Sequence, residues 1–138
     1  RKMENIEMRR RPKLELLFEE NLDKFNSMVE KGSPPKLRDC NISGLDLRKA
    51  NLRGLDLSGS YLRGSNLRGL DLTGCNLQGA SLQGALISGT FFPKSIPAQE
   101  IMLSVKYGTR MRTSNLIDNT KIVATLLSEI RNILKNKN

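Results

Sequence analysis

An apolar residue returns at every fifth position of the chain from residue 37 to residue 92. The position two residues before it is mostly small or apolar, and the position two residues after it is Gly in nine of the twelve units. A period of five fits neither the α-helix, with 3.6 residues per turn, nor a plain strand, with two. The pattern therefore indicates a repeat architecture. The central residues are Leu37, Ile42, Leu47, Leu52, Leu57, Leu62, Leu67, Leu72, Leu77, Leu82, Ile87 and Phe92.

Each unit of five suits one side of a four-sided coil, because its two inward residues face the axis and its Gly turns the corner. Gly tolerates corner conformations that a Cβ would hinder. The Asn or Asp that precedes most central residues can bond the backbone of its own turn. Four units make one turn of twenty residues, and successive turns stack as parallel strands roughly 4.7–4.9 Å apart. Residues 35–94 give about three such coils.

The repeat units also carry a family resemblance. Ala50-Asn51-Leu52-Arg53-Gly54 and Cys75-Asn76-Leu77-Gln78-Gly79 resemble the pentapeptide repeat family, whose consensus is A(D/N)LXX. The resemblance covers residues 35–94 and implies a right-handed quadrilateral β-helix. Near the end of this segment, Leu86 and Phe91 replace the Asn or Asp of the consensus.

Apolar residues at helical spacing flank the repeats on both sides. They predict one helix within residues 12–31, a second that opens at Ser95-Ile96-Pro97 and runs through Tyr107, and a third from about Asp118 to Lys135. Stacked repeats need caps where their edges end. The predicted fold class is an all-β repeat solenoid with α-helical caps, with an N-terminal capping region (1–34), a β-helix (35–94) and a C-terminal helical cap (95–138).

Candidate catalytic residues are few. The sequence contains no His, which excludes His-based triads and His zinc sites. Asp46, Asp56 and Asp71 occupy turn positions on three different sides of the coil, so they do not converge on one substrate. Cys40 and Cys75 occupy small inward positions, where a buried thiol is a poor nucleophile. The sequence predicts no enzymatic activity, no cofactor and no metal site.

Charge points to an acidic partner. Lys and Arg number 23 against 14 for Asp and Glu, a formal net charge of +9. Stacked like charges on neighbouring strands are unfavourable, so an Arg48–Arg68 stack favours a partner carboxylate or phosphate. Tyr and Arg together are typical of binding hot spots. The predicted partner-binding residues are Arg48, Arg53, Tyr61, Arg63 and Arg68. The alternative is a solvated face that keeps the protein soluble.

The third predicted helix has a wider apolar stripe than a cap needs. Ile122, Leu126, Ile130 and Ile133 follow one side of it. This stripe can pack within the chain or against a second copy, which would give a two-fold homodimer. Residues 94–138 are also the most basic segment, with eight basic and three acidic side chains.

These features favour a protein–protein interaction or targeting module that binds an acidic protein surface. The module resembles the short capped β-helices of bacterial effectors, which implies delivery into a host cell. The use of only two cysteines and the charged N-terminus without a secretory signal favour a reducing, cytoplasmic compartment. The alternative function is binding of nucleic acid or anionic membrane lipid through the basic tail. The long acidic tubes with which some pentapeptide repeat proteins mimic DNA for topoisomerases differ in length and in sign of charge. No run approaches the 18–20 apolar residues of a transmembrane helix.

Overall fold

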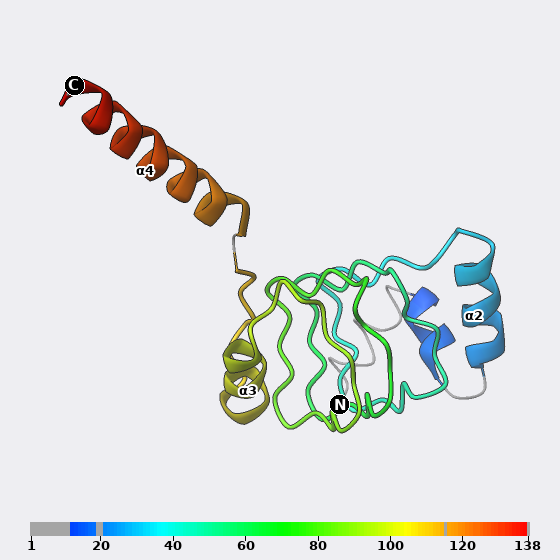
Figure 1. The fold of residues 1–138 in the computed structure, drawn as a ribbon. Helices are drawn as coiled ribbons and strands as arrows, with labels where there is room; N and C mark the ends of the chain where they lie inside the picture. The colour runs from blue at the N-terminus through cyan, green and yellow to red at the C-terminus, as the bar shows by residue number, and fades with distance from the viewer. Residues whose placement is uncertain (1–11, 19–20, 115, 138) are drawn as a thin grey trace.

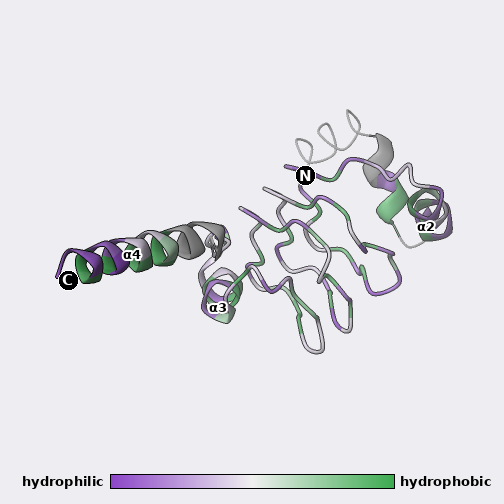
Figure 2. Ribbon diagram, turned by 45° about the horizontal axis from the view of Figure 1, so that its top comes forward, coloured by the Kyte–Doolittle hydropathy of each residue, from purple (hydrophilic) through white to green (hydrophobic). Residues whose placement is uncertain are grey.

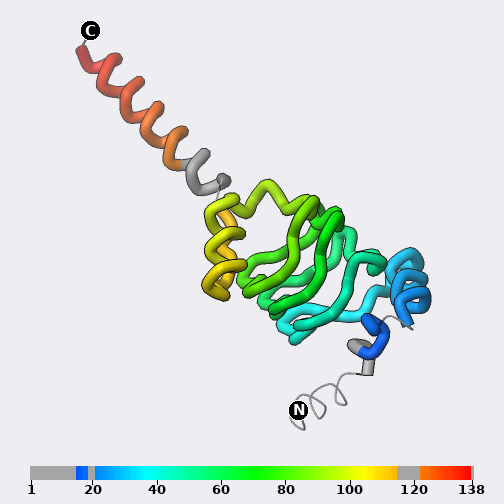
Figure 3. Tube along the Cα trace, turned by 90° about the horizontal axis from the view of Figure 1, so that it is seen from below, coloured from blue at the N-terminus to red at the C-terminus, as the bar shows by residue number. Residues whose placement is uncertain are grey.

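The computed structural model describes residues 12–18, 21–114 and 116–137. Its helical elements are the 3₁₀-helix η1 (Pro12–Leu17) and the α-helices α2 (Leu22–Glu30), α3 (Ala98–Tyr107) and α4 (Leu116–Asn136). Between α2 and α3 the chain winds into a stack of coils (Figure 1). η1 and α2 lie at one end of this stack and α3 lies at the other. α4 projects away beyond α3 (Figures 1 and 3).

Parallel β-bridges set the register of the coils. They join residues twenty apart: Asn41 with Tyr61, Asp46 with Asn66, Asp56 with Asn76, Tyr61 with Ser81, Asn66 with Leu86, and Asp71 with Phe91. The predicted period of twenty residues per turn is therefore present in the structure, as is the parallel pairing.

The predicted stacked strands are not found. All six bridges are isolated, and the described residues contain no continuous β-strand. Each side of the coil contributes one bridged residue before the backbone turns at the next corner. The right-handed β-helix implied by the resemblance is thus not confirmed as a strand structure.

The coil interior is a column of aliphatic side chains. The ten central residues from Leu37 to Leu82 are at most 1% exposed, and the last two, Ile87 and Phe92, are partly buried. Small polar side chains at the other inward position bond carbonyls of the preceding coil. Ser65 Oγ donates to the Ile42 carbonyl at 2.7 Å, and Thr90 Oγ1 donates to the Leu67 carbonyl at 2.7 Å. Burial of these two hydroxyls therefore leaves neither of them without a hydrogen-bond partner.

The corners are built as the sequence predicts. The side-chain oxygen of the Asn or Asp before the central residue accepts a hydrogen bond from the backbone N–H two residues later, as Asp46 does from Arg48 at 3.2 Å. Eight of the nine repeat glycines have a φ of 66–74°, a conformation that a Cβ disfavours. Asp39 takes the same left-handed corner with a φ of 57° and no Gly.

The N-terminal cap differs from the single predicted helix, since the 3₁₀-helix η1 and the α-helix α2 divide it. Leu17 of η1 and Phe25 of α2 are buried against the first coil. The Asn26 side chain completes the coil's open edge. Its Nδ2 donates to the Lys49 carbonyl at 2.9 Å, and its Oδ1 accepts from the Asn51 N–H at 2.6 Å.

The C-terminal cap consists of α3 and the segment 108–114. α3 ends at Gly108, which has a φ of 74°. Met111 is fully buried and pairs with the edge of the third coil: its carbonyl accepts from the Gly79 N–H at 2.7 Å, and its N–H donates to the Ala80 carbonyl at 2.9 Å. Ser104 Oγ of α3 accepts from the Leu82 N–H at 2.8 Å. The sequence predicts the helix but not the paired segment after it.

α4 has the position predicted for the third helix, within two residues at each end. The structure describes its side chains from residue 122 to residue 137, and all of them are exposed. Within the described ranges, no helix is both long enough and apolar enough to cross a membrane.

Candidate interaction surface

A hollow of about 340 Å³ opens on the coil where the sides carrying Leu47 and Leu52 meet. It is shallow and polar, and three cationic residues lie along its wall. It is lined by Arg48, Lys49, Ala50, Asn51, Leu52, Arg53, Gly69, Leu70 and Asp71. The repeat places Arg48 and Arg53 there because both follow a central Leu, at consecutive sides of the first coil.

Arg48 is fixed by a carboxylate of its own turn. Its Nε and Nη2 donate to Asp46 Oδ1 and Oδ2 at 2.9 and 2.7 Å. Hydrogen bonds from the Arg48 side chain and backbone lower the pKa of the Asp46 carboxyl to about 2. The two-pronged pair holds the guanidinium in one orientation while both side chains remain about half exposed.

Asp71 is the carboxylate inside the hollow. Its Oδ1 accepts from the Thr73 hydroxyl at 2.7 Å and from the Thr73 N–H at 3.0 Å. These bonds, with a smaller contribution from the charge of Arg53, lower the pKa of Asp71. Asp71 therefore stays ionised at neutral pH and offsets part of the positive charge.

Arg68 extends the basic surface to the next coil. The parallel bridge between Asp46 and Asn66 sets the register in which Arg68 of the second coil stacks on Arg48 of the first. Arg68 is exposed but does not line the hollow. Four cations, at positions 48, 49, 53 and 68, thus face two carboxylates, Asp46 and Asp71, for a net charge of +2.

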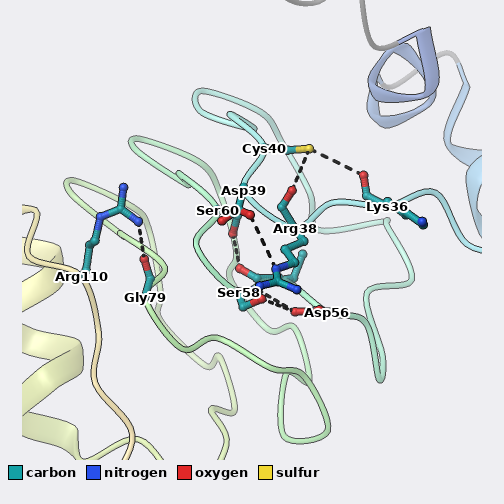
Figure 4. Close-up of polar contacts among 10 residues, drawn as sticks. Lys36, Arg38, Asp39, Cys40, Asp56, Ser58, Ser60, Gly79 and Arg110 are labelled. Carbon is teal, nitrogen blue, oxygen red and sulfur yellow. Dashed lines mark hydrogen bonds and ion pairs between the residues drawn. The ribbon is translucent and has the colours of Figure 1, made fainter.

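Tyr61 and Arg63 lie on another side of the coil, the one carrying Leu62. Tyr61 is 41% exposed, and its partner is Arg110 from the segment after α3. The Arg110 guanidinium carbon lies 4.9 Å from the centre of the Tyr61 ring, and Arg110 Nη2 donates to the Tyr61 hydroxyl. Arg110 Nη1 also donates to the Gly79 carbonyl at 3.3 Å (Figure 4). The predicted site residues therefore do not form one cluster.

A second arginine of the tail, Arg112, forms hydrogen bonds within the C-terminal cap. Arg112 Nε donates to Glu100 Oε1 of α3 at 2.7 Å, and the Arg112 N–H donates to the same oxygen at 3.0 Å. These bonds lower the pKa of Glu100, which is 9% exposed. Arg110 and Arg112 thus tie the segment 108–114 to the coil and to α3. The sequence offered no sign of these bonds, because the partners lie 49 and 12 residues away.

The acidic side chains of the coil each interact with residues one or two positions away in the sequence. Asp56 Oδ1 accepts from the Ser58 hydroxyl, which lowers the pKa of Asp56. Arg38 Nε lies 3.6 Å from Asp39 Oδ2, and both side chains are well exposed (Figure 4). Asp46, Asp56 and Asp71 follow three different sides of the coil. Among the described residues, no group of three or more His, Cys, Asp or Glu could hold a metal ion.

Cys40 and Cys75 are both buried in the coil interior as thiols, with no disulfide between them. Cys75 Sγ lies 2.9 Å from the Leu52 carbonyl, and burial raises the pKa of this thiol. Cys40 Sγ lies 3.4 Å from the Arg38 carbonyl (Figure 4). A buried thiol with a raised pKa holds little thiolate at neutral pH.

Comparison with known proteins identifies the repeat. Residues 56–92 match the family model of pentapeptide repeats, in eight copies. This part of the chain is therefore a pentapeptide-repeat segment, as its sequence resemblance predicted, and such segments suggest a protein-interaction module. No curated protein and no solved structure matches the chain.

Proposed function

We propose that the chain is a non-enzymatic interaction module that binds an acidic protein surface through the hollow and the arginines around it. The observation that carries the proposal is the convergence of Arg48, Lys49 and Arg53 on one open hollow. Arginine forks recognise carboxylates with two parallel hydrogen bonds. The Asp46 pair holds one of these forks in place, so less side-chain entropy is lost when a partner binds.

The non-enzymatic part of the proposal is supported by how the carboxylates are used. Asp46, Asp56 and Asp71 each bond the turn that follows them, on different sides of the coil. A general acid and base must be able to exchange a proton with the substrate, whereas each of these carboxylates is held by the backbone N–H of its own turn.

We also propose that the coil is a right-handed β-helix, and that the chain belongs to a bacterial effector that is cytoplasmic and is delivered into a host cell. The family resemblance supports the β-helix and the effector role. The alternative function is binding of nucleic acid or anionic lipid by the basic tail. It is less favoured because Arg110 and Arg112 form hydrogen bonds to Tyr61 and Glu100.

The proposal is tested with a defined acidic probe, a glutamate-rich peptide, added to ¹⁵N-labelled protein. We expect the amide resonances of residues 48–53 and 68–71 to shift in a saturable way. The affinity should fall as salt rises, because the contacts lie at an exposed surface. Shifts that are spread evenly over all basic residues would refute a defined site.

A matched pair of variants separates local recognition from net charge. Arg53→Glu with Arg68→Glu changes the charge by as much as Arg38→Glu with Arg63→Glu, but only the first pair lies on the proposed surface. We expect the first double variant to lose binding and the second to keep most of it. Equal losses in both would mean that the +9 net charge alone attracts the probe.

A further inference from the structure

α4 exposes a continuous apolar stripe. Its apolar and polar residues lie on opposite sides of the helix (Figure 2). In globular proteins such a stripe faces a core. The helix nevertheless projects away from the coil (Figures 1 and 3). Seven large apolar side chains are 52–61% exposed: Ile122, Val123, Leu126, Leu127, Ile130, Ile133 and Leu134.

The spacing within the stripe specifies the kind of surface that would cover it. Val123 and Ile130 are seven residues apart, and so are Leu126 and Ile133, which interleave with them at intervals of three and four. This is the spacing of a helix that packs lengthwise against another helix. α4 has 21 residues and is roughly 32 Å long, so the fitting surface is a partner helix of similar length.

A second copy of the chain supplies such a helix. We infer that α4 associates with α4 of a second copy through the whole of this apolar stripe, in which Val123, Leu126, Ile130 and Ile133 hold the spacing for helix packing. This inference concerns a different surface from the hollow and does not depend on the proposed function. Helices gain most of their stability from packing of an apolar face, so association stabilises α4 itself.

The exposed area agrees with one partner helix. Full burial of one aliphatic side chain removes about 60–120 Å², so seven half-exposed ones supply about 300 Å² per chain.

With the polar rim that interfaces carry, the total for two chains reaches about 1,000 Å². This is near the lower limit for a specific interface. We therefore expect dissociation in the micromolar range.

Sedimentation analysis of the intact chain across the micromolar range tests the inference. The mass should rise with concentration from 15.5 kDa to twice that value. Ile130→Glu places a charge at the centre of the stripe and should weaken association roughly 100-fold or more. Ser128→Glu adds the same charge on the opposite side of the helix and should leave association unchanged.

Thermal unfolding of the coil checks that the variants remain folded. Ile130 lies on the projecting helix, so Ile130→Glu should leave this transition in place. A monomer throughout the range, an associating Ile130→Glu variant, or equal losses with Ser128→Glu would each overturn the inference. A parallel experiment adds vesicles of anionic lipid to the wild-type chain. If the chain stays monomeric in solution but binds the vesicles, α4 is a membrane-surface helix instead of a dimer contact.

Discussion

Leu67→Ala tests the coil architecture at its centre. Leu67 lies in the middle coil, is 0% exposed, and stands in the same column as Leu47 and Ile87. Its backbone is held from above, because its N–H donates to the Leu86 carbonyl at 2.9 Å and its carbonyl accepts from the Thr90 hydroxyl at 2.7 Å. The backbone therefore has little freedom to close a cavity left by a shorter side chain.

The expected cost follows from the atoms removed. Leu67→Ala deletes three carbons, worth about 2.4 kcal/mol in transfer free energy at about 0.8 kcal/mol each. A cavity that does not collapse adds to this, and buried Leu→Ala substitutions cost about 2–5 kcal/mol. We expect the free energy of unfolding to fall by about 3–4 kcal/mol. The corresponding fall in Tm is roughly 10–15 °C for a chain of this size.

Urea denaturation followed by circular dichroism measures the loss. Ile87→Ala is the matched control, because it removes an aliphatic side chain from the same column in the last coil, where Ile87 is only partly buried. We expect it to cost about half as much, since the cost of such a truncation grows with burial. Equal losses in both variants would refute the reasoning that a fully buried side chain in the middle coil contributes more than a partly buried one in the last coil.

Three further outcomes can be checked by denaturation. Asn26→Ala leaves two backbone groups of the first coil without their partner and should cost about 1–3 kcal/mol; no loss would mean that water replaces the amide. Gly59→Ala and Gly64→Ala both strain a corner with a φ of 66°, but only at Gly59 does a Cβ collide with the Asp39 carboxylate. Gly59→Ala should therefore cost slightly more, because the exposed Asp39 carboxylate has to turn away, and Asp39→Gly in the same chain should abolish the difference. The pKa of Asp46 is lowered from 3.8 to about 2, so ionised Asp46 stabilises the fold fully above about pH 4, and this stabilisation is lost as the pH falls toward 2. Asp46→Asn should make the free energy of unfolding less dependent on pH over that window. The same pH dependence in Asp46→Asn as in the wild type would contradict the Arg48 pair.

The sequence predicted what the repeat itself determines. Period, register, inward residues and corner bonds all depend on residues within five positions of one another, or on multiples of five. The same local pattern placed Arg48 and Arg53 at consecutive sides, and the structure brings both to one hollow. Local spacing also identified α3 and α4, because their apolar residues follow the helical period.

Contacts between the coil and its caps could not be predicted, because nothing periodic links the partners. Asn26 meets the first coil 23 and 25 residues further along the chain. Tyr61 lies two residues from Arg63 in the sequence, whereas in the structure its partner is Arg110. Gln78 occupies an outward position of the repeat, yet its Oε1 accepts from the Thr113 N–H at 2.7 Å. One long-range hydrogen bond is enough to change the role of such a residue.

The C-terminal end of the coil shows why isolated bridges suit a short stack. The cap satisfies the N–H groups of Gly79, Leu82 and Gly84 on two sides of the third coil. On the other two sides, Leu86 and Phe91 are exposed, and among the described residues no hydrogen-bond acceptor meets the N–H of exposed Gly89. A long unpaired edge would recruit strands from other molecules. Here each side offers one bridging residue before a corner turns the backbone away, so the edge that remains is too short to template a strand.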